Sequence, residues 1–121
     1  DVAPSRGLGD VYKRQDKMLR LRKFYTEKDK IYDVACACKS NNSYMVPIID
    51  DNKIVLGIFN TNVLLNAVIN EISVKKTIKY VTLDKNFITV KPTLPYEECP
   101  NLAYVTEDGT KNTKLLGVIY K

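Results

Sequence analysis

The chain has 121 residues, of which 45% are hydrophobic and 27% charged, and it carries a formal net charge of +5 with no histidine. This is the size and composition of an ordinary compact globular protein, too short for a typical enzyme joined to a regulatory region. The lack of histidine excludes histidine-based acid/base and nucleophilic catalysis. The longest apolar runs, such as residues 54–59, are far too short to span a bilayer, so we expect no membrane segment.

Charge and cysteine content argue against two classes of site. The basic residues are spread along the chain between Asp and Glu, which favours a solvated surface, so we expect no nucleic-acid partner. Cys36, Cys38 and Cys99 make an odd number, which indicates reduced thiols and a cytoplasmic protein. Because Cys36 and Cys38 are two residues apart in a predicted helix, their side chains diverge, and we expect no metal site.

Residues 1–15 have no usable hydrophobic periodicity and contain two glycines and a proline. They resemble translated sequencing-adapter sequence, which predicts a non-native segment and a truncated gene. A flexible native N-terminus is the alternative. Both interpretations predict that this segment is disordered.

From residue 16 the pattern predicts a short strand and then a helix. Leu19, Leu21 and Phe24 alternate as strand residues do. The helix begins at Thr26 or Asp29 and ends near residue 40, before a turn-rich stretch. Its expected core positions are Ile31, Val34, Ala35 and Cys38.

Residues 45–65 predict a hairpin followed by a second helix. Residues 45–49 and 54–59 are rich in apolar and β-branched side chains, and turn-forming residues separate them. Asn60 and Asn62 can cap a helix that runs to about Ile72. We expect Leu65, Val68 and Ile69 to form its buried face.

The remainder of the chain predicts an imperfect second copy of this unit. Residues 86–93 indicate a strand, and residues 115–119 repeat the pattern of residues 55–59. Pro95 and Pro100 restrict the intervening helix to one or two turns, so we expect it to be shortened or lost. No closing helix follows the last strand, and we take this as a second indication that the native protein continues into another domain.

Two motifs carry a resemblance to a known family. Pro47-Ile48-Ile49-Asp50 and Leu56-Gly57-Ile58-Phe59 are similar in content and spacing to the Pro-Val-Val-Asp and Val-Gly-Ile-Ile pattern of CBS (cystathionine β-synthase-type) domains. The chain therefore resembles a CBS-domain pair, or Bateman-type module. The resemblance implies an α+β fold with a β-α-β-β-α repeat at residues 16–76 and a second, incomplete repeat at 77–121, packed about a pseudo-two-fold axis.

The resemblance also implies a function. Such modules are non-catalytic: they sense an adenosine-containing ligand, here ATP, ADP, AMP or S-adenosylmethionine, modulate an attached output domain, and pair as homodimers. No catalytic residue, resident cofactor or metal is implied. The alternative is a dimerisation or interaction scaffold of the same fold that has lost its ligand. Asp50 is part of the motif, but we expect it to serve as a turn-initiating carboxylate that bonds backbone N–H groups.

In ligand-binding members the adenine lies among apolar strand residues. The residue three after the glycine approaches the phosphates, and an Asp three further on binds the ribose. These two positions are Asn60 and Val63 in the first repeat, and the first of them is Tyr120 in the second. Val63 cannot bind a ribose, which favours the scaffold, and a plain helix cap explains Asn60 at least as well as a ligand contact. The candidate ligand-binding residues are Tyr44, Pro47, Ile58 and Asn60 around one cleft and Ile88, Thr89, Val118 and Tyr120 around the other, with core packing the simpler role for the apolar ones.

Overall fold

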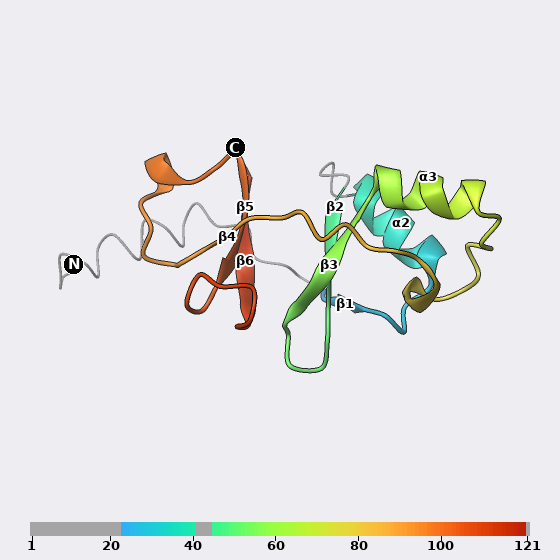
Figure 1. Cartoon of the computed structure of the whole chain (residues 1–121), viewed down its shortest axis with the longest axis horizontal. Coiled ribbons are helices and arrows are strands. Elements are labelled where there is room, and N and C mark those ends of the chain that lie inside the picture. The colour runs from blue at the N-terminus through green and yellow to red at the C-terminus, as the bar shows by residue number, and fades with distance from the viewer. Residues whose placement is uncertain (1–22, 41–44, 121) are drawn as a thin grey trace. The chain divides into compact units, whose positions relative to one another are not determined.

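A computed structural model describes residues 23–40 and 45–120, and these residues form two compact units (Figure 1). The first unit comprises Lys23–Asn86 and the second includes the chain from Phe87 onward. The sequence analysis placed the boundary earlier, after residue 76. The units divide later because Ile78 and Leu83 bury their side chains in the core of the first unit.

The first unit has the predicted order of strand, helix, strand, strand, helix. Its elements are β1 (Tyr25–Thr26), α2 (Ile31–Ser40), β2 (Met45–Ile49), β3 (Val55–Asn60) and α3 (Thr61–Ile69), followed by the short 3-10 helix η1 (Ile78–Tyr80). The sheet order is β1-β2-β3, with β1 parallel to β2 and β2 antiparallel to β3. The order expected for one repeat is confirmed, although Leu19 and Leu21 of the expected first strand lie outside the described residues.

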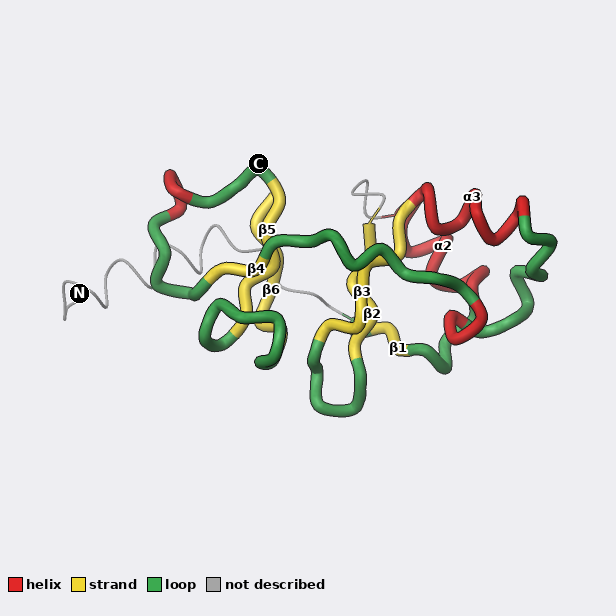
Figure 2. The backbone as a smooth tube through the Cα atoms, in the orientation of Figure 1, coloured by secondary structure: helices red, strands yellow, loops and turns green. Residues whose placement is uncertain are grey.

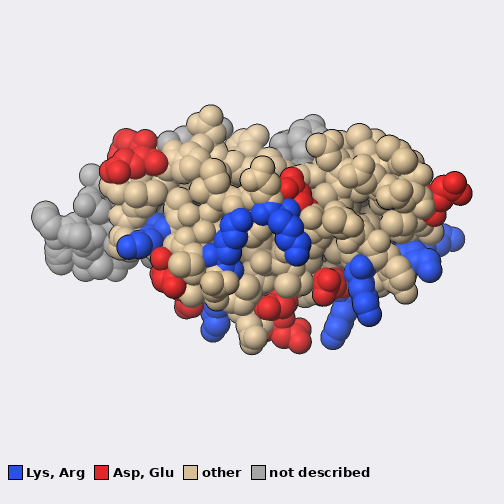
Figure 3. All heavy atoms as spheres, in the orientation of Figure 1, with Lys and Arg blue, Asp and Glu red and all other residues tan. Residues whose placement is uncertain are grey.

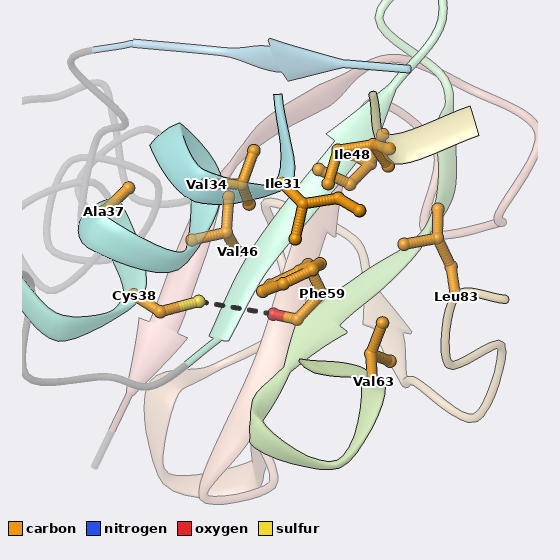
Figure 4. Packing of buried hydrophobic residues seen from close by; sticks show 10 residues of the cluster. Ile31, Val34, Ala37, Cys38, Val46, Ile48, Phe59, Val63 and Leu83 are labelled. Carbon is orange, nitrogen blue, oxygen red and sulfur yellow. Dashed lines mark hydrogen bonds between the residues drawn. The ribbon is translucent and has the colours of Figure 1, made fainter. Parts of the chain in front are cut away.

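Both helices of this unit pack on one face of the sheet and enclose its core (Figure 4). Alternate residues of the strands, such as Val46 and Phe59, point toward the helices because successive strand residues face opposite sides. The Cys38 thiol donates a 3.6 Å hydrogen bond to the Phe59 carbonyl oxygen, and burial raises its pKa to about 11. Of the expected core positions of α2, Ile31, Val34 and Cys38 are buried, while Ala35 is only partly buried.

The expected buried face of α3 is wrong. Leu65, Val68 and Ile69 are 52%, 58% and 74% exposed, and the helix buries Val63 and Ala67 instead. Apolar side chains occur on nearly every side of this helix, so its periodicity alone could not select the face that meets the sheet. The structure therefore leaves an apolar stripe on the outside of α3.

The same helix ends three residues earlier than expected, at Ile69 rather than Ile72. Asn70 is its C-cap and Glu71 has a positive φ of 60°. The Glu71 and Ile72 N–H groups donate to the carbonyls of Val68 and Ala67, at 3.0 and 2.9 Å. This is the hydrogen-bond pattern of a Schellman motif, which stops a helix by satisfying its last carbonyls.

The chain after α3 supplies the cap for α2. The N–H groups of Ile31 and Tyr32, in the first turn of α2, donate to the carbonyls of Lys76 and Val74, each at 2.9 Å. Ile78 in turn donates to the Asp29 carbonyl at 2.9 Å. Backbone groups thus satisfy helix donors that a side chain usually caps, and they fix the segment after α3 to the first unit.

That segment then crosses β3 at Gly57. Ile58 and Asp84 exchange two backbone hydrogen bonds of 2.8 and 3.0 Å, and Leu83 lies directly over Gly57. A Cβ on Gly57 would come within 2.6 Å of the Leu83 Cβ. Only glycine allows the two backbones to approach this closely.

The second unit repeats the sheet of the first (Figure 2). Its elements are β4 (Thr89–Val90), the 3-10 helix η2 (Tyr96–Glu98), β5 (Leu102–Thr106) and β6 (Leu115–Tyr120). The order is β4-β5-β6, again parallel and then antiparallel. Both hairpins shift register at corresponding positions, between Ile48 and Ile49 and between Val105 and Thr106. The imperfect repeat and its shortened helix are thus confirmed.

Replacing Gly57 with alanine should destabilise the protein. The new methyl group would force the segment around Leu83 away from β3, and we expect a loss of about 1–3 kcal/mol in the free energy of unfolding, measured by urea denaturation. A double variant, Gly57→Ala with Leu83→Gly, removes the clash and should be less destabilised than the sum of the two single changes. A Gly57→Ala protein as stable as the parent would contradict the close crossing.

Candidate functional site

Two candidate residues of the first repeat lie side by side on the sheet. Pro47 on β2 and Ile58 on β3 are directly opposite in the ladder, and both are buried. Their neighbours Val46 and Phe59 belong to the helix-side core, so Pro47 and Ile58 lie on the other face of the sheet. Tyr44, the fourth candidate of this group, lies outside the described residues.

Asn60 stands where β3 ends and α3 begins. Its side-chain oxygen accepts a 3.0 Å hydrogen bond from the Val63 N–H, which makes it the N-cap of α3 and confirms that explanation. Its side-chain nitrogen donates a 3.0 Å hydrogen bond to an Asp84 carboxylate oxygen. One amide therefore joins the start of the helix to the chain segment that crosses β3.

Asp84 is a site residue that the sequence analysis missed. Its second carboxylate oxygen accepts a 2.8 Å hydrogen bond from the Asn86 N–H, which closes a small turn. That local turn chemistry was visible in the sequence, but the contact with Asn60 spans 24 residues and has no local signal. Val63, at the expected ribose position, is buried in the helix-side core.

Asp50 serves the hairpin turn. One of its carboxylate oxygens accepts hydrogen bonds from the N–H groups of Asn52 and Ile54, at 2.8 and 3.0 Å. Lys53 adopts a positive φ of 63° within the same turn. Asp50 is therefore the turn-initiating carboxylate expected from the sequence.

The second repeat brings two candidates together through a tyrosine. Thr89 on β4 and Val118 on β6 both pair with Tyr104 on β5, which is buried and lies between them. Its ring makes an edge-to-face contact with Phe87, with 5.8 Å between centroids. Tyr104 occupies the register position of Pro47, and the sequence analysis did not select it because the proline of the motif is absent there.

The other two candidates of this repeat are more open to solvent. Ile88 is 53% exposed, and its carbonyl accepts a 2.9 Å hydrogen bond from the Tyr104 N–H. Tyr120 is 48% exposed and stands opposite Leu102 at the end of the β5-β6 ladder. Their side chains are available to a ligand or partner, whereas those of Pro47 and Ile58 are packed.

Similar solved structures identify this arrangement. AcuB from Vibrio cholerae is 20% identical, with a TM-score of 0.70 over 88% of this chain and 82% of that one. CBSX2 in complex with AMP is 16% identical, with a TM-score of 0.63 over 89% of both chains. The CBS-domain pair of protein MJ0100, in complex with 5′-methylthioadenosine and S-adenosylmethionine, is 20% identical, with a TM-score of 0.60 over 88% of this chain and 86% of that one.

The chain has the fold of a CBS-domain pair. Neither a scan of protein-family models nor a search of curated proteins finds a match for the sequence. The resemblance read from the Pro47 and Gly57 motifs is therefore confirmed at the level of the fold.

The hairpin loop of the second CBS repeat is held together by polar contacts. One Asp108 carboxylate oxygen accepts hydrogen bonds from the Thr110 N–H, the Thr110 hydroxyl and the Thr113 hydroxyl, at 2.7–2.8 Å. These bonds lower the pKa of Asp108. Gly109, with a φ of 86°, accepts a 2.6 Å hydrogen bond from the Thr89 hydroxyl. The Thr89 hydroxyl, which the sequence analysis assigned to a ligand site, is therefore already hydrogen-bonded to this loop.

The described part of the chain shows no group of three or more metal-ligating side chains. Cys36 is exposed and Cys38 is buried, so the two side chains diverge as expected. On the face shown in Figure 3, basic side chains lie in several separate groups with acidic groups between them. None of the helices in residues 23–40 and 45–120 is long and apolar enough to cross a membrane.

The pKa of Asp108 should be measurable as a low value. Because the folded-state pKa lies below the unfolded value of about 3.9, the loop contacts contribute stability above that pH and lose it as pH falls through the lower folded value. Carboxyl NMR should show Asp108 titrating at lower pH in the parent than in a variant carrying Thr110→Val and Thr113→Val. An unchanged titration in that variant would mean that the two threonines do not hold the carboxylate.

Proposed function

We propose that this CBS-domain pair is a non-catalytic regulatory module, which senses an adenosine-containing ligand and modulates an output domain attached to it in the full-length protein. The observation that carries the proposal is the duplicated sheet, with corresponding register and bulges, in a fold solved elsewhere with adenosyl ligands. The candidate ligands are ATP, ADP, AMP and S-adenosylmethionine.

The side chains at hand fit binding better than catalysis. The half-buried Val118 offers apolar strand surface of the kind that accommodates an aromatic base, and the half-exposed Tyr120 offers a ring for stacking. The sequence has no histidine, the commonest general base in enzymes. A ligand would act by binding one conformation of the pair more tightly than another.

We place the module in the cytoplasm, where thiols such as Cys36 stay reduced. An exposed thiol without a disulfide partner among the described cysteines suits a reducing compartment.

Ligand binding can be tested by a thermal-shift screen of the full chain. ATP, ADP, AMP and S-adenosylmethionine are titrated separately, and the melting temperature of the protein is recorded. We expect a rise of about ten degrees with at least one of them, since a ligand at about 100 times its Kd adds about 2.7 kcal/mol to the stability of the native state. A cooperative melt that no ligand shifts would overturn the sensing function.

A matched pair of tyrosine variants localises the site. Tyr120→Ala should weaken binding of the active ligand, whereas Tyr32→Ala, at an exposed tyrosine on α2, should leave it unchanged. Equal effects of the two substitutions would remove Tyr120 from the site.

A second candidate function, a ligand-free homodimerisation scaffold, is favoured by the outer face of α3. Leu65, Val68 and Ile69 form an exposed apolar stripe on one helix, and Val63 cannot bind a ribose. We propose that a second copy of the chain covers this stripe. Dimerisation is compatible with ligand sensing as well.

A charged residue within the exposed apolar stripe of α3 should disrupt the proposed dimer. Val68→Lys should shift the protein from dimer to monomer in light scattering, with a loss of about 2 kcal/mol or more in association free energy, because a buried charge must be desolvated. Asn52→Lys adds the same charge in the hairpin turn of the same unit and should leave the mass unchanged. A monomeric parent, or a dimer that Val68→Lys leaves intact, would contradict this interface.

A further inference from the structure

The start of α3 already has a negative charge beside it. Asp84 places a carboxylate oxygen 3.0 Å from the amide nitrogen of Asn60, the N-cap residue of the helix. A helix N-terminus attracts anions because its first N–H groups and the helix dipole present positive charge there. In this protein the anion is part of the chain.

Several contacts hold Asp84 in this position. Its backbone N–H and carbonyl both bond to Ile58, at 3.0 and 2.8 Å, and its other carboxylate oxygen accepts from the Asn86 N–H at 2.8 Å. The preceding residue, Leu83, is buried against Gly57. The backbone of Asp84 is therefore fixed beside β3, and its carboxylate can leave Asn60 only by breaking its own hydrogen bonds to Asn60 and Asn86.

This placement has a consequence for the charge of a ligand. Asp84 is half-buried, so its field is screened less than that of a fully exposed carboxylate. In the CBS modules that the chain resembles, the phosphates approach the position of Asn60, and a phosphate there would meet the like charge of Asp84. An uncharged group would meet no such repulsion, and a cation would be attracted.

We propose that Asp84 is a specificity-determining residue, which selects adenosyl ligands whose 5′ substituent is uncharged or positively charged over nucleotides that carry phosphate. The inference rests on the proposed ligand-sensing function and narrows it to one chemical class. The proposed selection depends only on the Asn60 amide and the Asp84 carboxylate at the start of α3.

Isothermal titration calorimetry of the full chain tests this selection with three ligands that differ at the 5′ position. These are S-adenosylmethionine, with a sulfonium, 5′-methylthioadenosine, with an uncharged thioether, and AMP, with a phosphate. We expect 5′-methylthioadenosine to bind the parent about tenfold more tightly than AMP. In Asp84→Asn, AMP should gain about tenfold and S-adenosylmethionine should weaken.

Asp51→Asn is the matched control, since it removes the same charge from the hairpin turn at the opposite end of β3. It should leave the order of the three affinities as in the parent. Asp84→Ser is a second uncharged variant, and circular dichroism establishes which variants are folded. The parent also gives a test without substitution, because added salt should reduce its preference for 5′-methylthioadenosine over AMP.

The outcomes separate the inference from the proposed function. If AMP binds the parent as tightly as 5′-methylthioadenosine, if the parent's preference is insensitive to salt, or if the preference survives in a folded Asp84 variant, the inference is overturned and the sensing function stands. If no adenosyl ligand binds the parent or any folded variant, both are overturned.

Discussion

The crossing of residues 83–84 over β3 is the contact on which the first repeat depends. It exists because Gly57 has no side chain, so the backbone of Asp84 can pair with Ile58 while Leu83 closes the core. The same stretch of chain, a few residues earlier, caps α2 with its carbonyls. The connection between the repeats is therefore part of the structure of the first repeat. The motif has glycine at position 57 because a side chain there would clash with Leu83.

The fold could largely be predicted from local patterns. Turn chemistry at Asp50 and the β-branched runs on either side of it correctly predicted the first hairpin. Pro95 and Pro100 correctly predicted that the helix of the second repeat is short. The face of α3 could not be predicted, because Leu65, Val68 and Ile69 are as apolar as the residues it buries. The small Ala67 is buried instead, which indicates that side-chain size rather than hydrophobicity selects the buried face.

The candidate site was predicted only in part. Pro47 and Ile58 were selected by the motif and do lie opposite each other, because register follows from hairpin geometry. Asp84 and Tyr104 were not selected. The first depends on a contact 24 residues away, and the second replaces a motif residue with a different type at the same register position. Both belong to long-range geometry that a single sequence does not display.

The backbone cap of α2 has a consequence for how this protein tolerates mutation. Because the acceptors are the carbonyls of Val74 and Lys76, their side chains do not contribute to the cap and can be exchanged without removing it. An insertion or deletion between α3 and η1, by contrast, would move those carbonyls away from Ile31 and Tyr32 and leave the helix start unsatisfied. Positions 74 and 76 should therefore accept changes of residue type readily, whereas the connection accepts changes of length poorly, the reverse of what is usual for a surface loop.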